Sequence, residues 1–300
     1  MALKASDYAR LATERANPAT RHIDRLATRR IVELINAQDA LVAPAVGRES
    51  GRIARAAELA AEALRRGGRL LFVGAGTSGR IGVLEAAECP PTFGTSPRQV
   101  RAAIAGGRAS VFRAREGAED DERAGTAAAA GLSCGDMVVG IAASGITPYV
   151  RSALGAARRR GCATVLVTSN PAQARGCADV VIAPRVGAEV LTGSTRLKAG
   201  TAAKLVLNAL TTAAMIRLHK VYDHWMVDLK PTNRKLRLRA VRLVAELGRV
   251  SAPRAARLLG RSGGHVKTAV VMARLGLSRA SARRLLSSHE GSLRAALERR

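Results

Sequence analysis

The sequence predicts an α/β fold: a three-layer domain with a parallel sheet, a helical N-terminal segment and a small helical C-terminal module. Short apolar segments, of the kind that form buried strands, recur in the middle of the chain and alternate with helical stretches. That alternation implies a parallel sheet covered on both faces. The two ends of the chain read as mostly helical. We therefore expect three parts, at residues 1–67, 68–232 and 233–300.

The elements follow in order along the chain. Asn17-Pro18 is a helix-start signal, and a long alanine-rich helix is expected near Arg52–Arg66. A helix is also expected from Ser194 to about Lys220. In parallel sheets of this kind, ligands bind at the carboxyl ends of the strands. The strands are expected near Arg69–Gly74, Arg101–Ala105, Met137–Ala142, Thr164–Thr168 and Val180–Ala183.

The C-terminal part follows a break at Pro231-Thr232-Asn233. It reads as a longer helix and then a three-helix module, with stops and starts at Gly264, at Gly276 before Ser278, and at Gly291.

Composition limits the possible classes of protein. A chain of 300 residues buries about three quarters of its unfolded surface and needs no disulfide or metal to hold its core. No apolar run approaches the roughly 20 residues of a membrane span, and the first ten residues lack the apolar core of a signal peptide. We expect a cytoplasmic protein without membrane contact. The four scattered cysteines read as reduced thiols, and the five histidines show no metal-ligand spacing, so no metal site is expected.

The formal charge of +26 raises the question of nucleic-acid binding. Of the 49 basic residues, 42 are arginine, and alanine and glycine abound beside them, which indicates a genome-wide compositional bias. The last 70 residues hold 17 basic and three acidic side chains, a net +14, with almost no aromatics for base stacking. We expect a solvated basic surface rather than a nucleic-acid interface.

A glycine-rich turn follows the first predicted strand. Gly74 and Gly76 should end that strand, and a helix should start near Thr77. Backbone N–H groups of Gly76, Thr77 and Ser78 and the two hydroxyls would then face an anion, which the helix dipole favours. The turn lacks the lysine of a nucleotide-triphosphate loop and matches the dinucleotide pattern only formally. A phosphate seat is the favoured interpretation, against a cofactor site or a turn without a ligand.

Two further hydroxyl-rich turns follow later strands. Ser144 and Thr147 come after the strand at Met137–Ala142, and either can contact phosphate oxygens at the start of the next helix. After the last strand, Ser194 and Thr195 add hydroxyls, and Lys198 adds a positive charge. Each turn alone is compatible with ordinary helix capping. Three such turns on successive strand ends favour one shared ligand, a phosphorylated small molecule.

The order of motifs along the chain resembles that of the N-acetylmuramic acid 6-phosphate etherases. These motifs are GAGTSGR, EAAECPPTFG, EGAED, AASGxTPYV, EVLTGSTRLKAGTA and VYxxxMVD, and the opening TERANPATRHIDRLATRRIVELIN is similar too. The resemblance covers nearly the whole chain. It implies the sugar isomerase (SIS) fold with a C-terminal module similar to ubiquitin-associated domains, a homodimer, and no metal or cofactor. It further implies cleavage of the lactyl ether of the sugar phosphate to N-acetylglucosamine 6-phosphate and D-lactate, in bacterial recycling of cell-wall sugars.

The resemblance also assigns two catalytic carboxylates. Glu88, in AECPP, matches the family's acid that protonates the departing lactate oxygen, and Glu119, in EGAED, matches the second carboxylate, the expected base at carbon 2. The division of the two roles stays open. Glu85 and Glu116 are read as solvated or structural carboxylates.

The two prolines after Glu88 should stop the helix that begins at Thr77 and leave Glu88 in its last turn. Eleven residues of helix then separate Thr77 from Glu88 by roughly 16 Å. A hexose phosphate does not span that distance between its phosphate and carbon 2. We therefore expect an active site composed across a homodimer.

The chain departs from the family pattern at two positions. Ile146 replaces an arginine in AASGRTPYV, and Ala203 replaces a glutamine in GTAQK. The alternative to an etherase is a sugar-phosphate-binding regulator of the same fold, which would need neither glutamate. A transcriptional form would carry an N-terminal helix-turn-helix, for which residues 1–67 show no convincing pattern. An aldose–ketose isomerase would share the base at carbon 2 but would release no lactate.

Overall fold

The computed structural model describes residues 11–298. The prediction that the first ten residues lack the apolar core of a signal peptide concerns residues outside the described part. The chain forms two compact units. One holds the chain up to Ala87 together with Arg98–Thr211, and the other holds Glu88–Pro97 and Thr212–Arg300. The N-terminal segment belongs to the same unit as the sheet, and the predicted boundaries of the three parts stay a prediction.

A parallel sheet of five strands forms the centre of the first unit, in the order β2-β1-β3-β4-β5. This confirms the predicted fold class, and each strand lies within a few residues of its prediction. Because β1 lies between β2 and β3, successive connections leave it in opposite directions, and in folds of this kind ligands bind outside the carboxyl ends of the strands at such a switch point. The strands are β1 (Leu70–Gly74), β2 (Val100–Ile104), β3 (Met137–Ile141), β4 (Ala163–Val167) and β5 (Val180–Ile182).

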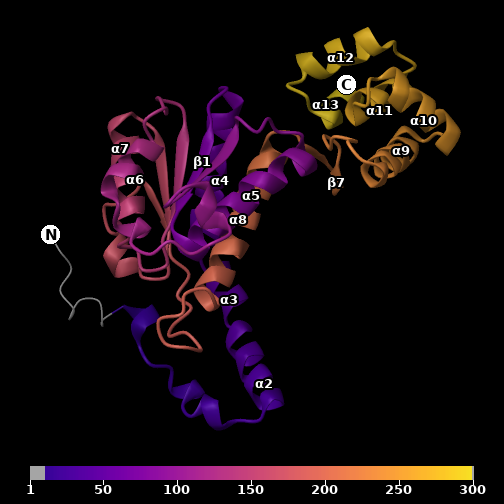
Figure 1. Cartoon of the computed structure of the whole chain (residues 1–300). Coiled ribbons are helices and arrows are strands. Elements are labelled where there is room, and N and C mark those ends of the chain that lie inside the picture. The colour runs from indigo at the N-terminus through magenta and orange to yellow at the C-terminus, as the bar shows by residue number, and fades with distance from the viewer. Residues whose placement is uncertain (1–10, 299–300) are drawn as a thin grey trace. The chain divides into compact units, whose positions relative to one another are not determined.

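Helices cover both faces of this sheet (Figure 1). α6 (Glu122–Ala128) and α7 (Pro148–Arg159) cover one face, while α4 (Ser50–Arg65), α5 (Gly76–Phe93) and α8 (Lys198–Arg217) lie on the other. Side chains alternate between the faces along each strand. On the α7 side, Leu71 and Val73 share one apolar cluster with Tyr149 and Leu154. Three-layer packing of this kind fixes the strand ends, and with them the loops that follow.

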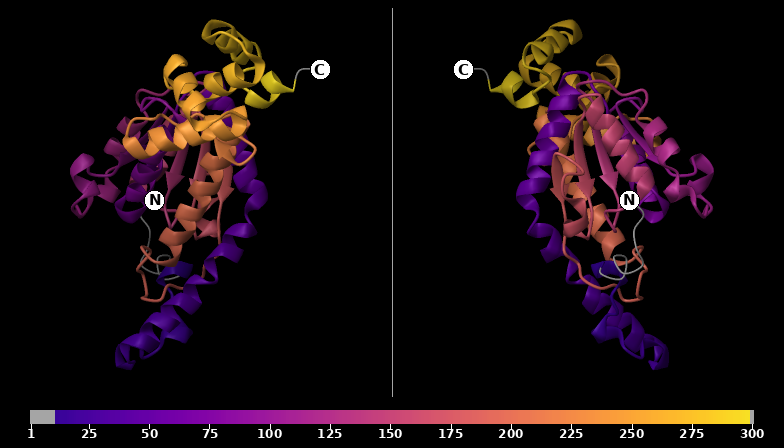
Figure 2. Two further views of the ribbon diagram at one scale, coloured as in Figure 1. Left: turned by 90° about the vertical axis from the view of Figure 1, so that its right-hand side faces the viewer. Right: turned by 90° about the vertical axis from the view of Figure 1, so that its left-hand side faces the viewer.

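From residue 11 to residue 47 the chain forms three short 3₁₀ turns and two helices, η1 (Ala12–Glu14), η2 (Pro18–Thr20), η3 (Ile23–Arg25), α2 (Thr28–Asp39) and α3 (Val42–Gly47). Asn17 begins η2, where its side chain accepts the Ala19 N–H at 3.0 Å. The predicted helix-start signal therefore initiates a 3₁₀ helix. α2 extends beyond the sheet (Figure 2) and contains no fully buried residue.

α8 begins four residues later than predicted, because the buried Glu189 caps it. The Glu189 carboxylate accepts the backbone N–H groups of Lys198 and Ala199, each at 2.9 Å. By length and composition α8 is apolar enough to cross a membrane, contrary to the expectation from the sequence, yet just over half of its apolar window is buried inside the protein. Thr211 of α8 donates to Glu85. Burial and a buried polar contact are features of a core helix.

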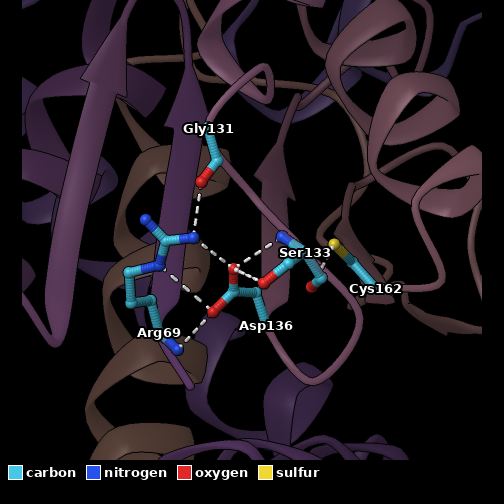
Figure 3. A network of polar contacts seen from close by, with 5 residues as sticks. All are labelled: Arg69, Gly131, Ser133, Asp136 and Cys162. Atoms are coloured by element: carbon cyan, nitrogen blue, oxygen red, sulfur yellow. Dashed lines mark hydrogen bonds and ion pairs between the residues drawn. The ribbon is translucent and has the colours of Figure 1, made fainter. Parts of the chain in front are cut away.

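An ion pair links the amino ends of β1 and β3 (Figure 3). Arg69, just before β1, contacts Asp136, just before β3, with Nη2 2.6 Å from Oδ2. Asp136 also accepts the backbone N–H groups of Arg69 at 2.7 Å and Ser133 at 2.8 Å. Burial raises the pKa of the Asp136 carboxyl, but the hydrogen bonds from Arg69 and Ser133 outweigh it, so that the pKa lies below its usual value. The Cys162 thiol donates to the Ser133 carbonyl, and burial raises its pKa.

Short 3₁₀ segments complete the first unit: η4 (Arg108–Val111), η5 (Ala118–Asp120) and η6 (Pro171–Ala174).

The second unit contains a small hairpin and a helical module. Its elements are β6 (Val221–Tyr222), β7 (Trp225–Met226), α9 (Arg234–Gly248), α10 (Ala252–Arg261), α11 (Val266–Leu275), α12 (Arg279–Ser288) and α13 (Leu293–Leu297). The predicted longer helix is wrong, because two helices replace it. Arg249 adopts a left-handed conformation with φ of 53°, and Ser251 begins α10 with a proline in its first turn. The predicted stops at Gly264, Gly276 and Gly291 are confirmed.

A half-buried ion-pair network joins the hairpin to the helical module within this unit. Asp228 Oδ2 lies 2.9 Å from the ammonium groups of both Lys220 and Lys267. Lys267 also donates to the Gly291 carbonyl, and burial lowers the pKa of its ammonium group. Trp225 packs against the apolar core of the module.

Candidate active site

The glycine turn after β1 brings the start of α5 against the sheet. A Cβ atom on Gly74 would lie 2.7 Å from the backbone nitrogen of Gly79, and one on Gly79 would lie 2.7 Å from the Gly74 carbonyl oxygen. Only glycine permits this approach at both positions. The turn therefore places Thr77 and Ser78 in the first turn of α5, where backbone N–H groups lack helical partners.

A small pocket with an empty volume of about 220 Å³ opens beside Ser78. It lies at the carboxyl ends of β3 and β4, where Ala143, Thr168 and Ser169 contribute to its wall. Hydroxyl groups at a helix start are suited to phosphate oxygens. Sequence reasoning missed Thr168 and Ser169, although both follow a predicted strand, because Thr168 was assigned to the strand itself. Ala203, one of the two departures from the family pattern, also lines this pocket.

Ser144 and Thr147 lie half-buried in the turn that leads from β3 into α7. The Ser144 hydroxyl accepts the backbone N–H of Ile146 at 3.3 Å, and Thr147 is the residue before the first turn of α7. They adjoin Ala143 of the Ser78 pocket in the chain. Ile146, the second departure, is buried at 8% exposure and serves as an apolar packing residue here.

The first turn of α8 approaches the glycine turn. An added Cβ on Gly200 would lie 3.4 Å from the Thr195 carbonyl oxygen and 3.5 Å from the Thr77 methyl group. Ser194 and Thr195 are half-buried. Lys198 has a different environment from the one its prediction assumed. Its side chain is 2% exposed, its ammonium donates to Gln38 at 2.9 Å, and burial lowers its pKa. Its predicted contact with phosphate stays a prediction.

A second and larger pocket contains the predicted Glu119. Its empty volume is about 480 Å³, and Gly76 of the glycine turn lines it together with Glu119. The same glycine turn therefore contributes to both pockets, with Gly76 in this one and Ser78 in the smaller one. Glu119 lies in the short η5, which Gly117 begins with a φ of 72°. Glu116 lines the same pocket. Location in the pocket therefore does not by itself distinguish Glu119, the predicted base, from Glu116.

Glu88 is exposed on α5 and belongs to the second compact unit. The prediction that the two prolines end the helix is wrong, because α5 continues through Pro90 and Pro91 to Phe93. The Gly94 N–H donates to the Pro90 carbonyl at 3.0 Å and closes the helix, with Gly94 at a φ of 67°. Glu88 therefore lies more than one turn before the end of α5.

Glu85, one turn earlier, is buried and paired. Its carboxylate lies 2.7 Å from the Lys204 ammonium and accepts the Thr211 hydroxyl at 2.5 Å. Of the two interpretations from the sequence, the solvated one is wrong and the structural one is confirmed, since Glu85 joins α5 to α8.

Within residues 11–298, no group of three or more histidine, cysteine or acidic side chains is arranged to hold a metal ion.

Comparison with known proteins identifies the relatives of this chain. The model of the glucokinase regulatory protein N-terminal SIS domain matches residues 52–158. A protein of Symbiobacterium thermophilum named N-acetylmuramic acid 6-phosphate etherase is 56% identical over 87% of this chain and 88% of its own. Its counterpart of the same name in Edwardsiella ictaluri is 50% identical over 96% of this chain and 97% of its own.

Solved structures share a more distant likeness. The phosphoheptose isomerase of Neisseria gonorrhoeae is 18% identical, with a TM-score of 0.45 over 62% of this chain and 97% of its own. The Vibrio vulnificus NanR protein, solved with ManNAc-6P, is 17% identical, with a TM-score of 0.44 over 61% of this chain and 63% of its own.

The relatives at 50% identity and above match most or nearly all of this chain and of their own length. The chain therefore belongs to the N-acetylmuramic acid 6-phosphate etherase family.

Proposed function

We propose that this protein cleaves the lactyl ether of N-acetylmuramic acid 6-phosphate and gives N-acetylglucosamine 6-phosphate and D-lactate. The names of its close relatives support this activity. The observation that carries it in the structure is that one glycine turn contributes to two pockets, Ser78 to one rich in hydroxyls and Gly76 to one lined by Glu119. A phosphate seat and a carboxylate base are what a reaction on a sugar phosphate requires.

The reaction is an elimination followed by a hydration. With the sugar in its open-chain form, Glu119 takes the proton from carbon 2, which the neighbouring aldehyde makes acidic. The bond between carbon 3 and the ether oxygen breaks, and Glu88 protonates the departing lactate. Water then adds at carbon 3 and gives a proton to the Glu88 carboxylate, while Glu119, whose proton exchanges with solvent, returns a proton to carbon 2. Each carboxyl group ends the cycle in its starting protonation state, and no cofactor is consumed.

Phosphate binding falls to the hydroxyls at the carboxyl ends of the strands. Ser78, with the N–H groups of Gly76 and Thr77, forms the first part of this site. The predicted contributions of Ser144 and Thr147, and of Ser194, Thr195 and Lys198, complete the proposal. Thr168 and Ser169 join it because they line the Ser78 pocket.

We propose that the active site is composed across a homodimer. α5 is one continuous helix, so its geometry separates Thr77 from Glu88 by about 16 Å along the axis. The sugar whose phosphate lies on one subunit would then meet Glu88 of the other. α2 supports the homodimer, because this 12-residue helix buries no residue and exposes Val32 at 59%. A helix with an uncovered apolar face is typical of a subunit interface.

Complementation tests the composite site. Ser78→Ala and Glu88→Gln, each inactive or weakened alone, are mixed after partial unfolding so that subunits exchange. A composite site predicts recovered activity, because one of the two sites in a mixed dimer then carries neither substitution. Activity that stays at the level of the separate variants would contradict the composite arrangement.

The cellular setting follows from the reaction. A cytoplasmic enzyme of this kind would recover amino sugar from cell-wall fragments, as the resemblance implies.

Release of D-lactate from N-acetylmuramic acid 6-phosphate tests the activity. We expect release by the wild type, and loss of it in Glu88→Gln and Glu119→Gln. Glu116→Gln is a matched control, since Glu116 lines the same pocket as Glu119 but should keep most of the activity. Sugar-phosphate binding by the wild type without lactate release would favour a regulator instead. Equal losses in Glu116→Gln and Glu119→Gln would overturn the assignment of the base.

A further inference from the structure

The pocket that holds Glu119 also contains two arginines without acidic partners. Arg80 of α5 and Arg115 of the loop before η5 both line it. Arg80 donates from Nε to the Val111 carbonyl at 2.9 Å, and Arg115 donates from Nη1 to the Gly106 carbonyl at 3.1 Å. Neither forms an ion pair with any residue from 11 to 298. The backbone thus fixes two guanidinium groups and leaves their remaining N–H donors for another acceptor.

A buried hydroxyl in the same pocket also lacks a partner. Ser110 lines the pocket, is 4% exposed, and its Oγ has no hydrogen-bond partner within the described chain. An unpaired buried hydroxyl is unfavourable, and native proteins rarely leave one without a role. A Cβ on Gly106 would lie 2.3 Å from this Oγ and 3.0 Å from Cδ of Arg115. The glycine therefore lets Ser110 and Arg115 lie against the same backbone turn.

The depth of these groups distinguishes the floor of the pocket from its rim. Ser110 is buried and Arg80 is half-buried, whereas Arg115, Glu116 and Glu119 are exposed. A negatively charged group that enters the pocket would meet the hydroxyl and the Arg80 guanidinium below the two carboxylates. A guanidinium fork held in place suits a carboxylate, to which it donates two parallel hydrogen bonds.

We propose that Arg80, Arg115 and Ser110 form the subsite for the carboxylate of the lactyl group. This inference rests on the proposed function. The substrate then carries two anionic groups, and its carboxylate lies only four bonds from carbon 2, the atom that Glu119 addresses. The pocket lined by Glu119 is where that carboxylate must lie. The subsite selects sugars with an acidic ether at carbon 3 and releases the product sugar, which lacks this group, more readily than the substrate.

Binding measurements separate this role from a structural one. The dissociation constants of N-acetylmuramic acid 6-phosphate and N-acetylglucosamine 6-phosphate are measured by calorimetry in Glu119→Gln protein, so that the substrate is not consumed. Arg80→Met and Arg115→Met are added to this background. Arg108→Met is the matched control, since Arg108 lies exposed in the same segment and outside the pocket lining.

The expected result is a selective loss. Removal of one charge-assisted contact should weaken binding of the substrate by about tenfold or more, while binding of the product sugar changes less than about twofold. The ratio of the dissociation constant of the substrate to that of the product sugar is compared with the parent. A rise of more than threefold in this ratio, in either arginine variant and not in Arg108→Met, supports the subsite. A ratio within threefold of the parent in both variants overturns it, whether the two affinities fall together or not at all. Lactate release by the wild type is a separate test, and its absence would refute the proposed function instead.

Discussion

Replacement of Asp136 by asparagine should destabilise the protein, because it removes the charge that pairs with Arg69 at the amino ends of β1 and β3. In the structure the carboxylate is 3% exposed and receives the Arg69 guanidinium and two backbone N–H groups. Asparagine keeps one acceptor oxygen. Its NH₂ group replaces the other carboxylate oxygen and faces the N–H donors that this oxygen accepts in the wild type. Loss of one partner of a buried ion pair costs about 3–5 kcal/mol.

The lower end of this range applies here, because the Arg69 side chain is 30% exposed and water can solvate it again. We therefore expect a loss of about 3 kcal/mol in the free energy of unfolding at pH 7. Urea denaturation followed by circular dichroism measures it. Asp24→Asn, an exposed carboxylate, is the matched control and should change the free energy by less than about 0.5 kcal/mol.

The pH dependence provides a second check. The folded-state pKa of Asp136 lies below its value of 3.8 in the unfolded chain. A lowered pKa means that the stabilisation is complete above the unfolded pKa and is lost as the pH falls through the folded one. The difference in the free energy of unfolding between wild type and Asp136→Asn should therefore be constant from pH 7 to about pH 5 and become smaller below about pH 4. A difference under about 0.5 kcal/mol at pH 7, or one that becomes larger in acid, would refute this reasoning.

Three further substitutions probe the site and the helices that position it. Gly79→Ala places a Cβ 2.5 Å from Ile104 Cγ1 and close to the Gly74 backbone, so a thermal melt should show a loss of about 1–3 kcal/mol; an unchanged melting temperature contradicts the close approach. Lys204→Met leaves the buried Glu85 without its cation and should cost about 3 kcal/mol in urea, whereas Lys204→Arg keeps most of the stability. Ser78→Ala removes a donor to phosphate and should weaken binding of N-acetylglucosamine 6-phosphate by about tenfold or more; unchanged binding would exclude Ser78 from the phosphate site.

The strands were predictable because each is a short, wholly or mostly apolar run followed by a turn signal. Local sequence decides such elements, and β1 and β3 lie within a residue of their predicted positions. The end of α5 was not predictable in the same way. Pro90 and Pro91 each remove one backbone donor, yet the helix continues for three residues after Pro90, and Gly94 rather than the prolines closes it.

The candidate site likewise contains residues that local sequence could predict and residues that it could not. Hydroxyls that follow strands could be found from the sequence, because their position relative to a strand is local. The partner of Lys198 could not, since Gln38 lies 160 residues away in the chain. The arginines and the serine beside Glu119 were missed for a similar reason. Arg80 belongs to the start of α5 and Ser110 to η4, and only the fold brings them to one pocket.

The central claim is that this protein removes lactate by elimination and hydration through carbon 2. Proton NMR of the reaction in D₂O tests it most directly, because it observes both products at once. The account predicts free D-lactate together with N-acetylglucosamine 6-phosphate that carries one solvent deuterium at carbon 2. Lactate released with the original proton still at carbon 2, or no lactate at all, would contradict it.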